Sequence, residues 1–427
     1  MKFFQQMLVA TAAMGLIAPI GAQANDINFE GINDYSRNKT SKKQKQFNSK
    51  TFANELASTN SRVDAIEAQL NNFEAGSFSD TTTLGGKAVF VLGSIDNNDS
   101  LGDTEAVTAA YIYSMDLNTS FTGDDNLYVR LKSGDGWDAW GDKPGNYHIE
   151  NKDTGDSLNV DKLWYTFPIG DKFTATVGPK IENYYMLAAA PSVYKPGVLK
   201  GFKLGGHGIA FGASTSTGAG ITYKGDNGFA VSTTFNSKKA ALAEGLFTDE
   251  DQNKINTQVA YTTDNYHLSA TYTMQQGWNS WSYYSTADLN ANSGDVTTTL
   301  DGVALRGWWR PDETGTATPS ISVGYDVVSI EGTNVTDGSG YFVGLNWEDM
   351  FRPSDRIGLA LGQPMKATEA AAGQVLSEVD PLMWEAYYSF RPNDSIEITP
   401  GIFGTTDVKN DSEEDLFGLM VSTTFKF

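Results

Sequence analysis

The sequence predicts an all-β fold, a transmembrane antiparallel β-barrel of about 16 strands preceded by a short N-terminal coiled-coil helix. The first observation is the C-terminal segment 415–427, which alternates one apolar face with one small or polar face up to its last residue. The second is a series of short turns that alternate with longer loops. The third is an aromatic residue beside each short turn. An outer-membrane barrel ends on such a strand because its last strand pairs with its first and faces lipid on one side.

Composition limits the class of protein. The chain has 427 residues with 43 glycines, 23 phenylalanines and no cysteine, which fits an exported protein without disulfides. After the N-terminal leader, no apolar run is long enough for a transmembrane helix, whereas a barrel strand needs an apolar side chain only at every second residue. The net charge of −21 argues against nucleic acid as a partner.

Three segments precede the predicted barrel. Residues 1–24 read as a secretory signal peptide, with an apolar core and an Ala-Gln-Ala cleavage site. Residues 25–50 form a polar, basic linker, which is either solvated or in contact with peptidoglycan or another anionic wall polymer. Residues 51–75 carry an a/d heptad pattern, which predicts a coiled-coil helix that ends near Gly76.

The heptad seam favours three or four strands over two, and we expect a homotrimer. Its interface residues are Leu56, Val63, Ile66 and Leu70. About three heptads are marginal as an isolated coiled coil, but fusion to an already oligomeric barrel raises their local concentration. The alternative is a helix that packs on its own domain.

Residues 76–427 read as strands joined by short turns and longer loops. The turns contain the Gly, Pro, Asp and Asn residues that favour tight reversals. Roughly seven turns and eight loops connect about 16 strands, and the even count places both termini on the periplasmic side. The turns are 122–126, 168–171, 225–228, 263–265, 311–315, 352–355 and 391–394. The loops are roughly 96–103, 133–157, 180–208, 237–253, 276–298, 331–338, 363–380 and 405–414.

Aromatic residues mark the strand ends beside the short turns. Such residues form a girdle at the membrane interface of outer-membrane barrels. Their presence beside every short turn favours a barrel over a soluble β-sandwich. They are Phe121, Phe167, Phe229, Tyr266, Trp309, Trp347, Phe390 and Phe427.

Two runs of sequence resemble a known family. They are RVDAIEAQLNNFEAGSFSDTTTLGGKAVFVLG (62–93) and LNTSFTGDDNLYVRLKSGD (117–135). With the terminal Phe427, they resemble the cyanobacterial outer-membrane porins of the carbohydrate-selective porin family, some of which are described as iron-uptake porins. The resemblance implies an outer-membrane location and contact with its lipid. Members usually carry an S-layer-homology domain before the coil, whereas only 25–50 stands there in this chain.

Strand parity predicts which charged residues face the barrel interior. In 127–132, Leu127, Val129 and Leu131 would face lipid, so the residues between them face inward. A charge on the lipid face costs about 2–4 kcal/mol near the bilayer midplane, so charges on other strands are also assigned inward unless a bulge shifts the register. These residues line a pore or merely solvate a wet interior. They are Arg130, Lys132, Lys162, Arg306, Arg310, Arg356, Arg391, Asp326, Glu348 and Glu385.

Loop 180–208 is basic, whereas the loops 133–157 and 405–414 are acidic. The third long loop of porins commonly folds into the barrel, so the resemblance implies that this loop forms a constriction. Its aromatic rings could stack on sugars, and its lysines could bind hydroxyl groups or attract anions. The residues concerned are Lys195, Lys200, Lys203, Tyr184, Tyr185 and Tyr194.

The sequence therefore predicts a porin for passive diffusion of small hydrophilic solutes, such as sugars, inorganic ions and iron species. No cofactor motif, metal-ligand spacing or catalytic set is evident. One alternative is a structural envelope tether that uses the coil and linker, with the barrel as its anchor. Another is a barrel enzyme, for which inward-facing His267 beside Ser269 is the only candidate on a wall strand.

Overall fold

The computed structural model describes residues 77–79, 81–96, 107–136, 152–212, 215–278, 284, 286, 289, 297–376, 380–407 and 415–427. The chain divides into two compact units, Met1–Asp80 and Thr81–Phe427. In the first unit, only the three-residue strand β1 (Ser77–Ser79) is described. The predicted leader 1–24, the linker 25–50 and the coil 51–75, with Leu56, Val63, Ile66 and Leu70, lie outside the described residues.

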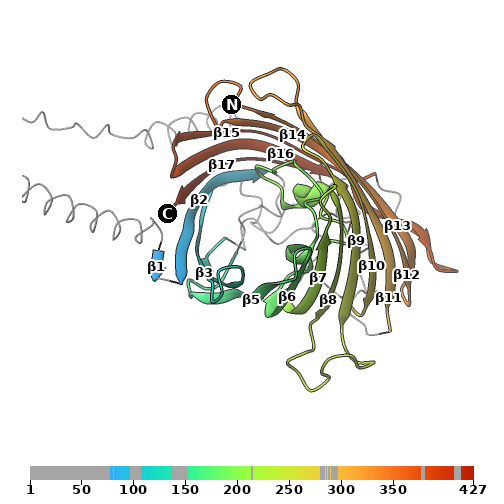
Figure 1. The fold of residues 1–427 in the computed structure, drawn as a ribbon. Coiled ribbons are helices and arrows are strands. Elements are labelled where there is room, and N and C mark those ends of the chain that lie inside the picture. The colour runs from blue at the N-terminus through green and yellow to red at the C-terminus, as the bar shows by residue number, and fades with distance from the viewer. Residues whose placement is uncertain are drawn as a thin grey trace, which may run out of the picture. The chain divides into compact units, whose positions relative to one another are not determined.

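The second unit is a closed antiparallel barrel, whose described residues form sixteen strands, β2 to β17. Each strand pairs with the next along the chain, and β17 pairs with β2 to close the ring (Figure 1). Their bounds are β2 Thr82–Asp96, β3 Thr108–Thr119, β4 Asn126–Gly134, β5 Asn159–Ile169, β6 Phe173–Ile181, β7 Ser216–Lys224, β8 Phe229–Ser237, β9 Asn253–Thr262, β10 Tyr266–Gln276, β11 Thr299–Trp309, β12 Ser320–Glu331, β13 Val335–Glu348, β14 Arg356–Ala370, β15 Leu382–Asn393, β16 Ile396–Thr406 and β17 Leu416–Lys426.

The predicted alternation of short and long connections is confirmed except at one loop, and the predicted loop 363–380 begins too early because β14 continues to Ala370. All seven predicted turns lie between paired strands. The predicted loop 331–338 is wrong, because only residues 332–334 separate β12 from β13. The two strands continue their ladder through this region, where Ser329 pairs with Asp337. Of the residues that suggested a long loop, Gly332 and Asn334 lie in this short connection, whereas Asp337 and Gly338 pair within the sheet.

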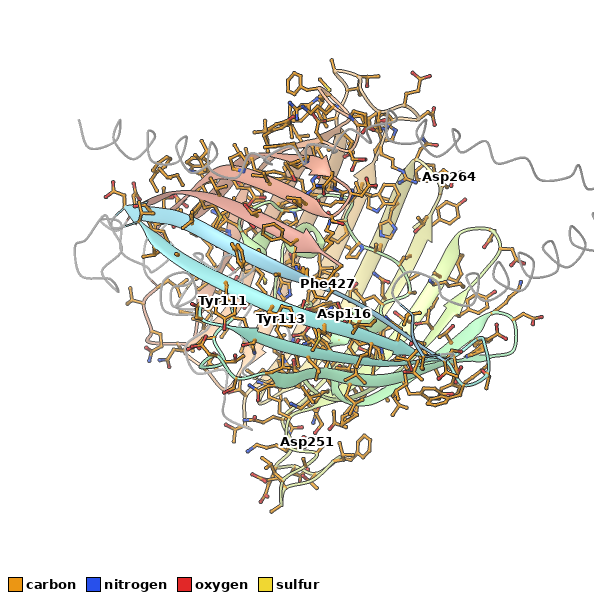
Figure 2. The ribbon with its side chains drawn as sticks, turned by 90° about the vertical axis from the view of Figure 1, so that its left-hand side faces the viewer. Tyr111, Tyr113, Asp116, Asp251, Asp264 and Phe427 are labelled. Atoms are coloured by element: carbon orange, nitrogen blue, oxygen red, sulfur yellow. The ribbon has the colours of Figure 1, made fainter. Side chains whose placement is uncertain are left out.

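The strands alternate as predicted between an exposed apolar face and a buried polar face. On β10, Leu268 is 64% exposed and Tyr272 is 44% exposed, whereas Thr271 and Thr273 are fully buried. The same alternation continues to the chain end, where Phe427 exchanges backbone hydrogen bonds with Gly86. Figure 2 shows Phe427 beside Tyr113 of β3, and their ring centroids are 5.9 Å apart.

One long connection, residues 182–212, folds inside the ring and is called the inner loop below (Figure 1). It contains two short 3-10 helices, η3 (Asn183–Met186) and η4 (Lys200–Gly205). Apolar inner-loop residues, Val198, Leu199 and Phe202 among them, share a buried cluster with Phe342 and Met383 of the wall. Among the described residues, no helix is long and apolar enough to cross a membrane.

Candidate pore constriction

The inner loop is attached to the wall by a buried carboxylate. Glu385 on β15 is 2% exposed and accepts hydrogen bonds from the backbone N–H groups of Gly197, Val198 and Leu199, at 3.2, 3.0 and 2.6 Å. The Tyr194 hydroxyl also donates to it, at 2.6 Å. Charge-assisted bonds of this kind are roughly twice as strong as neutral ones, so they fix this stretch of backbone firmly.

Two buried basic side chains hold the loop further along. Arg306 on β11 donates to the carbonyl oxygens of Leu204 at 2.9 Å and Gly206 at 2.7 Å, and it forms an ion pair with Asp326 at 2.8 Å. Lys254 on β9 is fully buried and donates to the carbonyl oxygens of residues 209 and 212, at 2.7 and 2.6 Å. Buried polar groups are tolerated where hydrogen-bond partners compensate their lost hydration. The loop is therefore held by buried hydrogen bonds along much of its length.

These contacts change the expected roles of four predicted site residues. Arg306, Asp326 and Glu385 point inward as predicted, but each is at most 3% exposed because the inner loop covers it. They are anchors of the loop, and they do not line open water. Tyr194 was expected to face a solute, but its ring is 4% exposed and packs against Phe342. The reason is that the loop turns its apolar side toward the wall.

The predicted residues Arg130 and Tyr185 belong to a mixed aromatic and basic surface on β3, β4, β5 and the inner loop. The ring centroids of Tyr128 and Trp164 are 4.2 Å apart, and those of Trp164 and Tyr185 are 4.9 Å apart. Arg130 lies over the Tyr128 ring at 5.5 Å and forms an ion pair with Asp116 at 2.7 Å. These five residues are called the aromatic-basic surface. Tyr185 stays 40% exposed, so the surface is accessible.

The beginning of the inner loop is joined to this surface by a second ion pair. Lys162 is 4% exposed, and its ammonium group lies 2.9 Å from the Glu182 carboxylate. Burial alone would raise the pKa of Glu182, but the Lys162 charge and the Tyr184 hydroxyl lower the pKa to about 2. Glu182 therefore stays ionised at neutral pH. Tyr184 itself stacks beside Tyr185, with centroids 4.8 Å apart.

Basic residues also gather near the short-turn end of the wall. Glu397 on β16 lies 2.9 Å from Arg391, 3.2 Å from Lys426 and 3.9 Å from Arg356. Three cations around one carboxylate leave a net positive charge. Of the predicted residues, Arg356 and Arg391 belong to this group, and Arg356 also donates to the Tyr387 hydroxyl at 2.9 Å.

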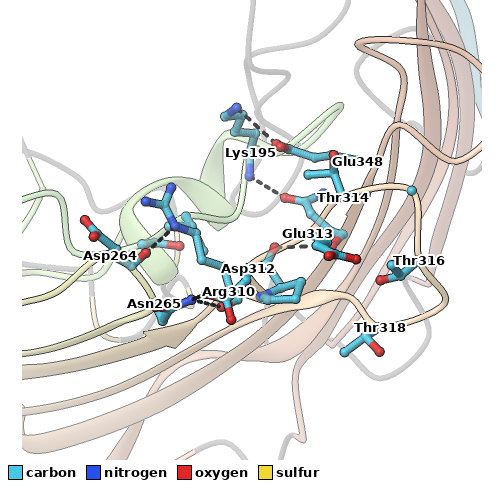
Figure 3. A pocket seen from close by; sticks show the side chains of 16 residues that line it. Lys195, Asp264, Asn265, Arg310, Asp312, Glu313, Thr314, Thr316, Thr318 and Glu348 are labelled. Atoms are coloured by element: carbon cyan, nitrogen blue, oxygen red, sulfur yellow. Dashed lines mark hydrogen bonds and ion pairs between the residues drawn. The ribbon is translucent and has the colours of Figure 1, made fainter.

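A polar cavity of about 490 Å³ lies between the inner loop and the turns that precede β10 and β12 (Figure 3). Lys195 and Glu348 form an ion pair across it at 3.3 Å. Arg310 lines it as well and donates to the Asp264 carbonyl oxygen, at 2.5 Å. Parity thus placed Arg310 and Glu348 on the inner side, but the cavity could not be read from the sequence because it is formed by segments far apart in the chain.

The remaining predicted residues are half-buried. Lys132 lies on β4, and Lys200 and Lys203 lie in η4. The sequence reasoning missed Asp116 and Lys254. Strand parity could have found Lys254, because Lys254, Asn256 and Gln258 alternate with Ile255, Thr257 and Val259.

The arrangement around His267 is that of a packed histidine. Its Nδ1 atom lies 2.7 Å from the Thr262 hydroxyl and its Nε2 atom 2.9 Å from the Ser269 hydroxyl. The ring is fully buried and stacks on Trp308. A nucleophile must be reachable by its substrate, so this geometry does not support the enzyme alternative. Within the part of the chain that the structure describes, no group of three or more His, Cys, Asp or Glu residues could hold a metal ion.

Comparisons with known proteins agree with this geometry. The family profile described as "Carbohydrate-selective porin, OprB family" matches residues 39–426. The uncharacterized protein alr4550 of Nostoc sp. is 26% identical over 422 residues, covering 88% of this chain and 70% of that protein. Pseudomonas putida OprB superposes with a TM-score of 0.56 at 11% identity, covering 81% of this chain and 94% of that chain. Salmonella typhi OmpF gives a TM-score of 0.53 at 12% identity, covering 81% and 97%. At such low identity, the solved structures show the fold alone.

Proposed function

Because the chain belongs to the OprB family of carbohydrate-selective porins, we propose that it is an outer-membrane diffusion porin whose constriction favours small neutral sugars. The observation that carries this proposal is the aromatic-basic surface beside the inner loop. The apolar faces of Trp164 and Tyr185 suit the C–H faces of a sugar ring. Arg130 and Asp116 supply a donor and an acceptor for its hydroxyl groups.

The immobile inner loop supports this assignment. A diffusion channel needs a fixed cross-section, and the contacts of Glu385, Arg306 and Lys254 hold the loop in one position. A bound sugar must also leave again, so few and partly solvated contacts are suitable. We propose small inorganic anions as a second class of permeant, because the group around Glu397 is net positive.

Sugar block of single-channel current tests the proposal. Trp164→Ala should weaken block by added mono- and disaccharides, because stacking area is lost, while conductance rises slightly. Phe167→Ala is the matched control, since Phe167 lies on the same strand but on the opposite face. Equal sugar block in wild type and in Trp164→Ala would contradict a role for this surface.

The coil and linker support a further part of the proposal, a homotrimer with both termini periplasmic and an added tethering role. The heptad seam of Leu56, Val63, Ile66 and Leu70 and the basic segment 25–50 favour it. Changing the four seam residues to Ser should lower the temperature at which oligomers dissociate, with unchanged unitary conductance. Deletion of 25–75 should loosen the envelope while conductance survives. Unchanged oligomers and an intact envelope would remove both roles.

A further inference from the structure

The loop between β8 and β9, residues 238–252, exposes three apolar side chains. Leu242 is 56% exposed, Leu246 40% and Phe247 79%. This segment, called the projecting loop, extends away from the wall, and Figure 2 labels its Asp251. Single exposed apolar side chains are normal on a protein surface, whereas several that cluster together indicate an interaction site.

The projecting loop is held in a defined shape. Lys239 and Glu244 form an ion pair at 3.0 Å, and the Thr248 hydroxyl donates to the Glu244 carbonyl oxygen at 2.9 Å. Asp251 is fully buried and accepts a hydrogen bond from the Ser237 hydroxyl at 2.6 Å. Gln276 on β10 donates to the Asp249 carbonyl oxygen at 2.9 Å. These contacts order the loop although its apolar side chains are exposed.

The position of Phe247 is the most informative feature. Its φ of 61° lies in the left-handed region, which is unfavourable for a non-glycine residue and persists only where surrounding contacts impose it. Its ring stacks on Phe235, with centroids 4.8 Å apart. The neighbour of Phe235, Asn236, is buried and donates to the Ile181 carbonyl oxygen inside the barrel. Phe235 therefore faces outward, and Phe247 continues the outward apolar face past the end of β8.

We propose that the projecting loop inserts Leu242, Leu246 and Phe247 among the acyl chains of the outer leaflet, as an additional membrane anchor. Its continuity with the outward ring of Phe235 favours lipid as the occupant over a second copy of the chain. The acidic side chains Asp249 and Glu250 are exposed on the same loop and would remain in the headgroup layer. Insertion would remove the apolar area of these three side chains from water, which favours the buried position. This inference rests on the proposed outer-membrane barrel.

The absence of cysteine from the chain allows a direct test by site-directed spin labelling. Phe247→Cys would carry a nitroxide, and the full-length protein would be reconstituted in liposomes. Two further labels provide references: Leu268→Cys in the wall, 64% exposed, and Val375→Cys in another loop, 94% exposed. The measurement is the collision rate with oxygen, which concentrates in lipid, and with a nickel chelate, which remains in water.

We expect the oxygen-to-nickel ratio at 247 to match that at 268 and to exceed that at 375 severalfold. A ratio at 247 equal to that at 375 would overturn the anchor. Dipolar broadening at 247 that disappears on dilution with unlabelled protein would also overturn it, because a second copy would then occupy the site. A water-like ratio at 268 would instead contradict the barrel placement, so the two failures are distinguishable.

A second variant keeps the proposal testable without a label. Changing Leu242, Leu246 and Phe247 together to Ser should lower the detergent concentration that extracts the protein from liposomes. Sugar block and conductance should be unchanged, because the projecting loop joins β8 to β9, whereas the aromatic-basic surface lies on β3, β4, β5 and the inner loop. Unchanged extraction would count against the anchor.

Discussion

At the scale of single residues, Glu385 and Glu348 both contact the inner loop, but only Glu385 is buried. Glu385→Ala leaves the buried N–H groups of 197–199 without acceptors, at about 1–3 kcal/mol for each unsatisfied group. Glu348→Ala removes an exposed ion pair with Lys195, worth about 0–1 kcal/mol. We expect trypsin to cut the inner loop after Lys200 or Lys203 only in Glu385→Ala, together with a lower unfolding temperature. Equal proteolysis of both variants would show that Glu385 does not hold the loop.

The lowered pKa of Glu182 predicts that the stability of the folded protein depends on pH. A carboxyl group whose pKa falls on folding stabilises the folded state above its ordinary pKa, and this contribution is lost as the pH falls. For Glu182, the loss should run from about pH 4.5 down to about pH 2. The unfolding temperature of the wild type should therefore fall over this pH range more steeply than that of Glu182→Gln. Parallel curves for the two proteins would remove the Lys162–Glu182 pair as the cause.

Strand parity was sufficient to orient single residues but could not show what covers them. The inward direction of Arg306 and Glu385 follows from a two-residue period, which is a local property. Their burial depends on the inner loop, whose contacts with them join residues at least 100 positions apart in the sequence. For the same reason, Tyr194 was expected at a solute but packs on the wall. Of the aromatic-basic surface, only Arg130 and Tyr185 were predicted site residues, and both stay partly exposed in the structure.

At the scale of elements, two turns share one construction. Asp125 and Asp355 each accept hydrogen bonds from backbone N–H groups of their turn and from a tyrosine hydroxyl, that of Tyr165 or Tyr388. Asp355 is 1% exposed, so Asp355→Ala should lower the free energy of unfolding by about 1–3 kcal/mol. Asp394→Ala, at an exposed turn position, is the control. A thermal melt that separates neither variant from wild type would contradict this role of the turn.

The closing strand is a second element with a testable role. The Phe427 N–H donates to Gly86 O at 3.1 Å, and Gly86 N–H donates to Phe427 O at 2.9 Å. A Cβ at Gly86 would lie 2.4 Å from the Ser114 carbonyl oxygen and 2.7 Å from the Phe427 ring, so glycine is needed at this position. Deletion of Phe427 should greatly reduce the fraction of heat-modifiable barrel in outer membranes, and Gly86→Val should act in the same direction. Normal assembly without Phe427 would contradict the closing role.

At the scale of the whole molecule, the ring could be predicted because turn chemistry and strand parity repeat along the chain. The loop 331–338 was mistaken because turn-forming residues were counted without the pairing of Ser329 with Asp337. Pairing is a property of two strands, so one sequence segment does not reveal it. The charge distribution could be predicted only in part. Parity predicted which charged residues face the interior, but it did not predict which of them are neutralised by buried partners.

The whole-molecule charge pattern leads to a prediction of ion selectivity. The net charge is −21, and the loops 133–157 and 405–414 are acidic, so the loop side should concentrate cations. The interior carries the basic group around Glu397 and the inner-loop lysines Lys195, Lys200 and Lys203. Exposed loop charges are screened within about 8 Å at physiological salt, whereas charges in a narrow interior are screened less. The interior should therefore dominate as salt rises.

We expect weak anion preference at high salt that shrinks or inverts at low salt, measured as the reversal potential across a potassium chloride gradient. Changing Lys195, Lys200 and Lys203 together to Glu should shift selectivity toward cations, because six units of charge change beside the constriction. Lys172→Glu is the control, since Lys172 lies in a turn, paired with Asp226 at 2.7 Å. If the triple variant keeps the reversal potential of the wild type, the inner loop does not border the path of the ions.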